Sequence, residues 1–241
     1  MKILSVDNLT KYFGGFAAVK NLTFSLQKGQ ITSIIGPNGA GKTTAIRLIS
    51  GELNPTTGSI RLKDKDITNS SINKNALLGI SRTFQVPAVF NCLTVFDNLK
   101  MAIHTKIKDK KDREDRCKSL LDEVGMSKEM NAYPAALPNH KKRILEWCMS
   151  AIQDPEIILM DELGAGLSDE ELTILYDHII KKVDKFTPLF IEHRLEFVFR
   201  ISEKVIVLNQ GTKLAEGTAK EILCNEKVKE AYFGNNCQYG G

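Results

Sequence analysis

A glycine-rich loop that contains a lysine and two threonines carries the clearest chemistry in this sequence. It reads GPNGAGKTT and fits the pattern G-x-x-x-x-G-K-[ST]. Its residues are Gly36, Pro37, Asn38, Gly39, Ala40, Gly41, Lys42, Thr43 and Thr44. Glycines allow backbone conformations in which successive N–H groups point inward at phosphate oxygens. Lys42 can reach the β- and γ-phosphates of a nucleotide, and the Thr43 hydroxyl can ligate Mg²⁺. The loop therefore predicts binding of a nucleoside triphosphate.

The segments on either side of this loop support that prediction. The apolar residues of 31–35 predict a strand that ends at the loop, and the amphipathic run 45–49 predicts a helix that begins near Lys42. The N-terminus of such a helix adds its positive dipole end to the phosphate site. Two other interpretations are a plain turn between two elements and a dinucleotide-binding loop. The first leaves the lysine and the threonines unexplained, and the second requires a different glycine spacing.

Four further polar residues stand at the ends of predicted strands. Gln85 ends one strand-like stretch, Asp161 and Glu162 follow another, and His193 comes just after a third. Ligands of open α/β sheets collect at the carboxyl ends of the strands. Asp161 suits Mg²⁺, which prefers carboxylate oxygens, and Glu162 can accept a proton from an attacking water. Each residue alone has a structural explanation, but together they predict a site for phosphoryl transfer.

Size and composition restrict the class of protein. The chain has 241 residues, 42% hydrophobic and 26% charged, which is typical of a globular protein with one large or two small domains. A net charge of +4 is too small to indicate nucleic-acid binding. The start lacks the features of a signal peptide, and no stretch approaches the roughly 20 apolar residues that cross a bilayer. The scattered cysteines predict free thiols in a reducing cytosol. They are Cys92, Cys117, Cys148, Cys224 and Cys237.

The order of predicted elements indicates an α/β fold with a helical insertion. Strand patterns fill residues 1–35, and helical patterns appear at 95–103, 116–124 and 139–152. A terminal helix is expected over 218–234. Tyr12 and Phe13 precede a flexible turn at Gly14-Gly15, where a ring could stack on an adenine. Spacing alone favours an ordinary core aromatic beside a hairpin.

The motifs taken together resemble the ATP-binding cassette (ABC) family of transporter ATPases. The resemblance covers roughly residues 3–234 and rests on the phosphate loop, on RTFQ at 82–85, on IILMDE at 157–162 and on IEH at 191–193. It implies one P-loop NTPase domain of the ABC type over 1–241. Its divisions are expected as follows: residues 1–85 and 153–234 form a mixed-sheet nucleotide-binding core with an antiparallel β subdomain, 86–152 form an α-helical subdomain, and 235–241 form a flexible tail.

The same resemblance implies roles for individual residues, with ATP and Mg²⁺ as cofactors. Phe13 would stack on the adenine, with Tyr12 as the second choice. Gln85 would sense the γ-phosphate, the attacking water and the metal. Glu162 would act as the general base, and His193 would bind the γ-phosphate. Thr43 and Asp161 would hold the Mg²⁺ ion.

Several segments look most like the subfamily that serves branched-chain amino acid importers. These are 82–85, 191–193 and 207–218. The resemblance implies an ATPase subunit that powers import of branched-chain or related amino acids from the inner face of the membrane. Its expected partners are transmembrane permease subunits, a second ATPase subunit and, indirectly, a substrate-binding protein, without nucleic acid. The alternatives are a non-transport ABC ATPase and a regulatory subunit that clamps nucleotide with little hydrolysis.

One segment departs from the family pattern. Where the family carries Leu-Ser-Gly-Gly-Gln, this chain has Leu137, Pro138, Asn139, His140 and Lys141. That signature segment normally contacts the γ-phosphate held by a partner cassette. Pro138 has neither a hydroxyl nor an N–H, and His140 places a ring where glycine is usual. Each lost charge-assisted hydrogen bond would cost on the order of 1.5–3 kcal/mol. Asn139 can still donate a hydrogen bond, and Lys141 brings a positive charge.

This departure predicts a heterodimer, because the half-site made by Lys42, Glu162 and His193 is complete while the half-site offered to a partner is poor. A second ATPase subunit would supply the intact signature, and the chain alone would show weak ATPase activity. Two milder departures are Leu163, where the family usually has proline, and Ser168, where it often has aspartate.

Overall fold

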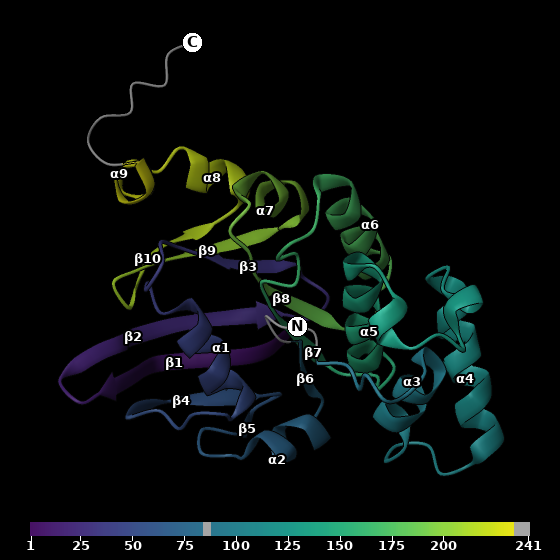
Figure 1. Ribbon diagram of the computed structural model, residues 1–241. Coiled ribbons are helices and arrows are strands. Elements are labelled where there is room, and N and C mark those ends of the chain that lie inside the picture. Colours follow the sequence, from purple (N-terminus) through teal and green to yellow (C-terminus); the bar gives the residue numbers. More distant parts are fainter. Residues whose placement is uncertain (84–87, 234–241) are drawn as a thin grey trace.

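The computed structural model describes residues 1–83 and 88–233, and it builds them into two sheets with helices packed on and between them (Figure 1). The first sheet is antiparallel and has the strand order β2-β1-β4-β5. Its strands are β1 (Lys2–Phe13), β2 (Phe16–Gln27), β4 (Thr57–Leu62) and β5 (Lys65–Asp66). The long β1–β2 hairpin turns at Gly14-Gly15, so that Phe13 pairs with Phe16 across the turn.

The second sheet has the order β10-β9-β3-β8-β7-β6. Its strands are β3 (Thr32–Ile35), β6 (Ile80–Thr83), β7 (Ile157–Asp161), β8 (Thr187–Ile191), β9 (Lys204–Asn209) and β10 (Thr212–Gly217). Only the pairing of β10 with β9 is antiparallel within this described sheet. The parallel strands therefore end at one common edge, which is where an α/β sheet places its ligands. The mixed α/β class expected from the sequence is confirmed.

Helix α1 (Lys42–Ser50) lies between the two sheets (Figure 1). Its apolar side joins one buried cluster with residues of both sheets, among them Ile34 and Leu159. Neighbouring strand residues point to opposite faces, so Ile35 belongs to a different cluster from Ile34. Burial of both faces explains why β7 is apolar up to its last residue, Asp161. The strand and helix that flank the phosphate loop are thus fixed by core packing.

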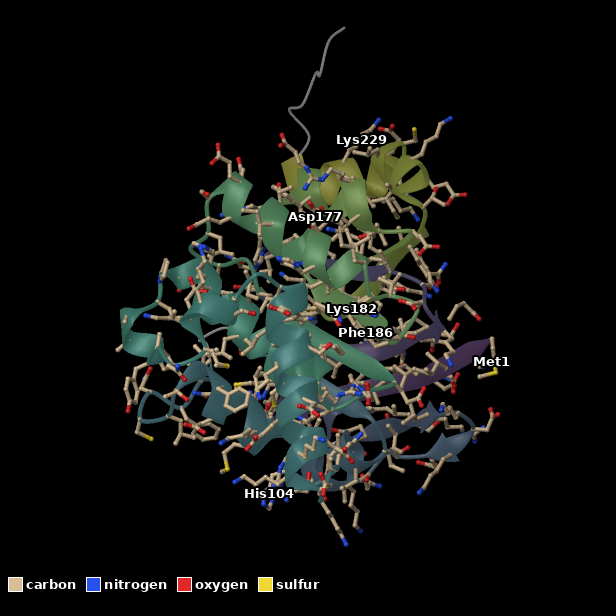
Figure 2. All side chains as sticks on the ribbon, turned by 90° about the vertical axis from the view of Figure 1, so that its right-hand side faces the viewer. Met1, His104, Asp177, Lys182, Phe186 and Lys229 are labelled. Carbon is tan, nitrogen blue, oxygen red and sulfur yellow. The ribbon has the colours of Figure 1, made fainter. Side chains whose placement is uncertain are left out.

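The helices between residue 88 and β7, together with α6, cover one face of the second sheet. They are α3 (Val95–Ile103), α4 (Lys110–Glu123), α5 (Asn139–Ala151) and α6 (Asp169–Ile180). Two short 3₁₀ turns, Ser127–Glu129 and Pro134–Ala136, join α4 to α5. Figure 2 looks onto this side of the molecule, with Lys182 and Phe186 labelled at its centre. The division into subdomains stays a prediction, because one continuous apolar cluster joins these helices to the sheet.

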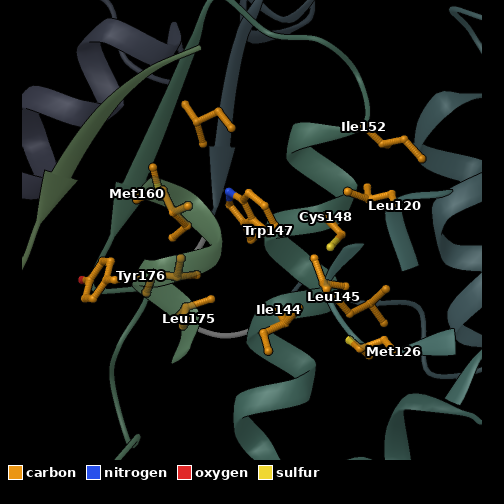
Figure 3. Close-up of a cluster of buried hydrophobic side chains, with 14 of the residues drawn as sticks. Leu120, Met126, Ile144, Leu145, Trp147, Cys148, Ile152, Met160, Leu175 and Tyr176 are labelled. Carbon is orange, nitrogen blue, oxygen red and sulfur yellow. The ribbon is translucent and has the colours of Figure 1, made fainter. Parts of the chain in front are cut away.

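Trp147 lies within that cluster and is fully buried. It packs from α5 among residues of α6 and β7, including Tyr176 and Met160 (Figure 3). Its burial among apolar side chains identifies Trp147 as a packing residue. Leu163, which stands in place of the usual proline, is 1% exposed and belongs to the same cluster. A leucine here therefore contributes apolar burial that stabilises the loop after β7.

The last helices cover the other face of β3 and β9. They are α7 (Leu195–Ile201), α8 (Ala219–Leu223) and α9 (Glu226–Phe233). Tyr232 on α9 packs against the cluster that contains Ile35, and a hydrogen bond joins its hydroxyl to the backbone of Gly36. Burial raises the pKa of Tyr232, and that hydrogen bond partly offsets the rise. The C-terminal helix thus contacts the first residue of the phosphate loop.

Three local expectations were wrong or incomplete. Helix α4 begins at Lys110 rather than at residue 116, because the Asp109 side chain accepts a hydrogen bond from the N–H of Asp112 and caps it. The single terminal helix is two helices, since Asn225 ends the first and accepts from the N–H of Val228 to start the second. Helices α2 (Ile72–Leu77) and α7 were not predicted. The predicted tail, 235–241, lies outside the described residues. Among the residues that are described, no helix has the length and apolar character to cross a membrane.

Candidate functional site

The phosphate loop connects the end of β3 to the start of α1, and its glycines sit where side chains do not fit. Gly41 is the N-cap of α1 with φ of 98°, and a Cβ there would lie 2.4 Å from the carbonyl oxygen of Ala18. A Cβ on Gly36 would lie 2.2 Å from the carbonyl oxygen of Leu208. Gly39 has φ of 78° and open space around its Cβ position. The backbone is therefore tightly held at both ends and open in the middle, as a cradle for phosphate requires.

Lys42 is buried to 6% exposure and points back into the loop. Its Nζ atom donates to the carbonyl oxygens of Gly36, at 2.7 Å, and of Pro37, at 3.0 Å. Burial lowers the pKa of Lys42, and the carboxylates of Glu162 and Asp161 oppose that change. These carbonyls hold the ammonium group over the loop, at the position from which it can reach phosphate oxygens.

Thr43 and Asp161 bring two oxygen ligands together from α1 and β7. The Thr43 hydroxyl donates to Asp161 Oδ1 at 3.4 Å. Asp161 is 3% exposed, and its Oδ2 accepts from the Arg82 guanidinium at 3.2 Å. Burial raises the pKa of Asp161, while Arg82 opposes the rise. A hydroxyl and a carboxylate are ligands that Mg²⁺ takes, with phosphate and water completing its shell, so these residues fit that ion.

Glu162 and His193 meet across the ends of β7 and β8. The Glu162 N–H donates to the carbonyl oxygen of Ile191 at 2.9 Å, which continues the pairing of the two strands by one residue. Glu162 has φ of 52°, so its side chain leaves the strand direction at this point. His193 Nε2 lies 2.5 Å from Glu162 Oε1. A potential general base and a potential phosphate ligand are therefore in direct contact.

A pocket of about 390 Å³ joins these groups. It is lined by Phe13, Phe16, Ala18, Asn38, Gly39, Ala40, Gly41, Lys42, Thr43, Thr44, Glu162 and His193. Phe13 lies at one end of the first hairpin and is 46% exposed, as expected of a ring that can stack on a base. Tyr12 is 43% exposed but is not among the lining residues. Gly36 and Pro37 lie behind the lining, where they accept from Lys42.

The segment that departs from the family signature begins α5, and none of its residues lines this pocket. Leu137 is buried, and Pro138 is the N-cap of the helix without a side-chain hydrogen bond. His140 Nδ1 lies 2.7 Å from Glu171 Oε1 at the start of α6. Lys141 is ion-paired with Glu129. A Cβ on Gly166 would lie 3.2 Å from the side-chain nitrogen (Nδ2) of Asn139.

Ser168 takes part in the same region as the N-cap of α6. Its hydroxyl accepts from the Glu171 N–H, and the Glu171 carboxylate accepts from the Ser168 N–H, which forms a capping box. Those hydrogen bonds, with His140, lower the pKa of Glu171. The serine that replaces the usual aspartate thus has a structural role at the helix start.

Sequence reasoning did not find three residues of this site. Phe16 lines the pocket because the hairpin register places it opposite Phe13. Arg82 pairs with Asp161 because β6 and β7 are adjacent and parallel, and Glu192 is buried directly before His193. The aromatic after Gly14-Gly15 was a usable signal for Phe16. Gln85 lies outside the described residues, so its predicted place in the site stays a prediction.

Sequence comparisons find known proteins that are similar to this chain. The family model described as "ABC transporter" matches residues 19–165, and one described as "Branched-chain amino acid ATP-binding cassette transporter" matches residues 212–236. The high-affinity branched-chain amino acid transport ATP-binding protein LivG of Escherichia coli is 35% identical, over 96% of this chain and 98% of the relative. The protein BraF of Pseudomonas aeruginosa, which has the same description, is 34% identical over the same shares.

Solved structures show the same likeness. A nucleotide-free ATP-binding cassette from an ABC transporter has a TM-score of 0.88 and 31% identity, covering 97% of this chain and 100% of that one. An ATP-binding cassette in its ADP conformation has a TM-score of 0.87 at 31% identity, with coverage of 97% and 99%. A dimeric cassette at 22% identity, with a TM-score of 0.79, shares the fold. With the phosphate loop and its pocket in place, these matches show that the chain belongs to the ATP-hydrolysing cassettes of the ABC transporter family.

Proposed function

We propose that this chain is the ATP-hydrolysing subunit of an importer for branched-chain or related amino acids. The observation that carries the substrate class is the match of residues 212–236 to a model described for branched-chain amino acid cassettes. Those residues include β10, α8 and α9, which pack beside the phosphate loop through Tyr232. The transport function named for LivG and BraF supports the same assignment.

In this proposal the pocket holds ATP along its length. Phe13 stacks on the adenine at the hairpin end, and the N–H groups of residues 38–43 surround the phosphates at the other end. Lys42 exchanges its contacts with the carbonyl oxygens of Gly36 and Pro37 for contacts with the β- and γ-phosphates. The exchange keeps the ammonium group hydrogen-bonded both without and with nucleotide.

Thr43 and Asp161 hold the Mg²⁺ ion, which neutralises charge on the phosphates. Arg82 keeps the Asp161 carboxylate oriented, because its guanidinium also binds Glu52 and is 9% exposed. Gln85 follows the same strand and adds a ligand for the metal or the water. The site therefore combines a hydroxyl from α1 with a carboxylate that Arg82 holds in place.

Glu162 accepts the proton of the attacking water, and His193 binds the γ-phosphate. Their contact at 2.5 Å keeps each in place, so the carboxylate is directed toward the loop rather than toward solvent. Charge stabilisation around the phosphates supplies most of the remaining rate enhancement, since phosphoryl transfer requires little covalent participation from the protein.

The partners in this proposal are membrane permease subunits and a second ATPase subunit, and the chain works peripherally on the cytoplasmic face of the membrane. The altered signature favours a heterodimer. His140 and Lys141 are engaged with Glu171 and Glu129 of their own chain, and Pro138 offers no N–H to a phosphate. The second subunit would supply an intact signature to this chain's pocket.

Reconstitution tests the proposal. The chain, its permease and its second ATPase are purified as one complex, placed in vesicles and assayed for leucine uptake and ATP hydrolysis. We expect uptake that depends on ATP and is lost in the variant Glu162→Gln. Co-purification with ribosomes or DNA in place of a permease would contradict the proposal and favour a non-transport ATPase.

A second candidate function is a regulatory subunit that closes on ATP without hydrolysing it. The observation in its favour is Pro138, which starts α5 without a side-chain cap hydrogen bond. Single-turnover hydrolysis in the complete complex separates the two. A rate that falls by at least about 100-fold in Glu162→Gln supports the hydrolytic role, since general base catalysis contributes 10²–10⁴-fold.

A further inference from the structure

A buried carboxylate lies directly before His193 and has no role in the function proposed so far. Glu192 is 6% exposed and follows the last residue of β8. Its Oε1 atom accepts from the N–H of His193 at 2.8 Å and from the N–H of Arg194 at 3.3 Å. One oxygen of this carboxylate therefore holds two successive backbone groups at the point where the chain turns into α7.

The other oxygen is anchored in the core. Glu192 Oε2 accepts from the Tyr176 hydroxyl at 2.9 Å. Tyr176 comes from α6, is 1% exposed, and packs its ring against Phe190 at a centroid distance of 5.2 Å and against Phe197 at 6.1 Å. Burial, reinforced by Glu192, raises the pKa of Tyr176, so its hydroxyl stays protonated and able to donate. Tyr176 is thus a rigid donor for this carboxylate.

The same carboxylate also faces the loop that carries Glu162. A Cβ on Gly164 would lie 3.0 Å from Glu192 Oε2 and 2.2 Å from the Leu172 Cδ1 atom of α6. A side chain at residue 164 would therefore displace Leu172 or Glu192, because the loop passes close against both. A single buried group lies between the loop after Glu162, the backbone of His193 and helix α6.

We propose that Glu192 is a positioning residue that acts through His193. It fixes the backbone of His193 to Tyr176, so the exposed imidazole is held against Glu162 and over the phosphate end of the pocket. The side chain of His193 is 42% exposed and receives little packing of its own, so its placement depends on this backbone anchor. The inference rests on the proposed role of His193 in hydrolysis.

A set of single and double variants tests the inference in the complete complex. Glu192→Ala removes all three hydrogen bonds, and Tyr176→Phe removes one while it keeps the ring packing. Glu192→Gln keeps an oxygen for the two N–H groups, and the Tyr176 hydroxyl can accept from its amide. Each variant is combined with His193→Ala. The measurements are single-turnover hydrolysis of radiolabelled ATP, the Kd for ATP of each variant, and thermal unfolding.

We expect Glu192→Ala to slow single-turnover hydrolysis by about 10- to 100-fold, as misplacement of a reacting group does, with the Kd for ATP changed by less than about 3-fold. Glu192→Gln should stay within about 3-fold of the wild-type rate, and Tyr176→Phe should fall between the two. In the His193→Ala background, Glu192→Ala should have an effect of less than about 3-fold, because residues that act as a unit are not additive.

Two results overturn the inference. One is a normal rate for Glu192→Ala beside a slow His193→Ala, which leaves the proposed function intact. The other is an equal loss from Glu192→Ala in both backgrounds, which indicates a general structural effect. A full rate for His193→Ala itself would instead contradict the proposed role of His193, and the inference with it. If Glu192→Ala does not fold, the rate of Tyr176→Phe in both backgrounds decides in the same way, with Glu192→Gln as the control that should keep its rate.

Discussion

His193 Nε2 lies 2.5 Å from Glu162 Oε1, although the two residues are 31 positions apart in the sequence. The contact follows from strand register, because β7 and β8 are parallel neighbours and Asp161 pairs with Ile191. Each side chain is the first or second residue after its strand. The paired imidazole and carboxylate are therefore a product of the sheet, and their spacing is set by elements that are almost completely buried.

Removal of the carboxylate from this pair should abolish turnover without loss of nucleotide binding. We expect Glu162→Gln to lower hydrolysis by about 10²–10⁴-fold, which is the usual contribution of a general base. The amide retains the size of the side chain, so the Kd for ATP should change by less than about 3-fold. Single-turnover assays and equilibrium binding check this. A substantial loss of ATP affinity with normal turnover would contradict the role of Glu162.

The two phenylalanines of the first hairpin should contribute to nucleotide affinity, and their tyrosine neighbour should not. Stacking of a base on an aromatic ring is worth about 1–3 kcal/mol, so Phe13→Ala should raise the Kd for ATP by about 5- to 150-fold. Phe16→Ala should have a smaller effect in the same direction, because Phe16 lines the pocket but is 66% exposed. Tyr12→Ala is the matched control. Equal effects of Tyr12→Ala and Phe13→Ala on the Kd for ATP would contradict the assignment of Phe13 as the stacking ring.

The start of α5 offers a gain-of-function test. Pro138→Ser restores a hydroxyl and an N–H at the N-cap, and a serine cap stabilises a helix by about 0.5–2 kcal/mol relative to alanine. In the complete complex we expect hydrolysis to rise at the composite site that includes this segment. Pro138→Ala, which restores the N–H alone, is the control and should give a smaller increase. Unchanged hydrolysis in Pro138→Ser would show that the substituted signature does not limit turnover.

Acid stability should depend on Glu216, which joins β9 and β10. Burial raises the pKa of Glu216, but hydrogen bonds from Lys204 and Lys213 outweigh this effect, so the pKa lies below the ordinary value of 4.5 for a glutamate. A lowered carboxyl pKa stabilises the fold above pH 4.5, and this stabilisation is lost as the pH falls further. Glu216→Gln should therefore flatten the decline of the unfolding free energy below that pH. Denaturant titrations at several pH values measure it.

The control for that experiment is Glu226→Gln, since the side chain of Glu226 is 83% exposed beside Lys229. It should leave the acid limb unchanged. If the unfolding free energy falls equally steeply with pH in the wild type and in Glu216→Gln, the assignment of the acid sensitivity to Glu216 is contradicted.

Trp147 should matter for stability and not for chemistry. It is fully buried in the cluster that joins α5, α6 and β7, so Trp147→Ala should lower the free energy of unfolding by about 3–5 kcal/mol. Met101→Ala, at a position on α3 that is 56% exposed, should cost far less. Folded Trp147→Ala should bind ATP as the wild type does. Urea denaturation and equilibrium binding are the measurements.

The sequence was sufficient to predict the features that depend on local pattern. The phosphate loop, its preceding strand and the helix that begins at Lys42 are all read from spacing and periodicity, and the structure has them at those positions. Helix α3 was predicted at its observed bounds, because its apolar residues recur at helical intervals. Long polar helices gave no such signal, which is why the first turns of α4 were missed.

Contacts between distant elements could not be predicted in this way. The pairing of Arg82 with Asp161 requires the strand order, and the pairing of His140 with Glu171 requires the packing of α5 beside α6. The pairing of Lys141 with Glu129 also depends on packing, and it engages the positive charge that Lys141 was expected to bring to the signature segment. Single-residue chemistry was accessible from the sequence, but the partners of each residue depend on tertiary packing.

The hydrogen bond between Tyr232 and the backbone of Gly36 attaches α9 to the first residue of the phosphate loop. Gly36 donates its N–H to the Tyr232 hydroxyl, and its carbonyl oxygen accepts from Lys42, so this one residue connects an aromatic hydroxyl near the C-terminus to the ammonium group of the phosphate loop. Expression tags, fusions or truncations that displace α9 would remove this contact and loosen the phosphate loop. For that reason α9 and the phosphate loop should be kept together in any engineered version of this chain.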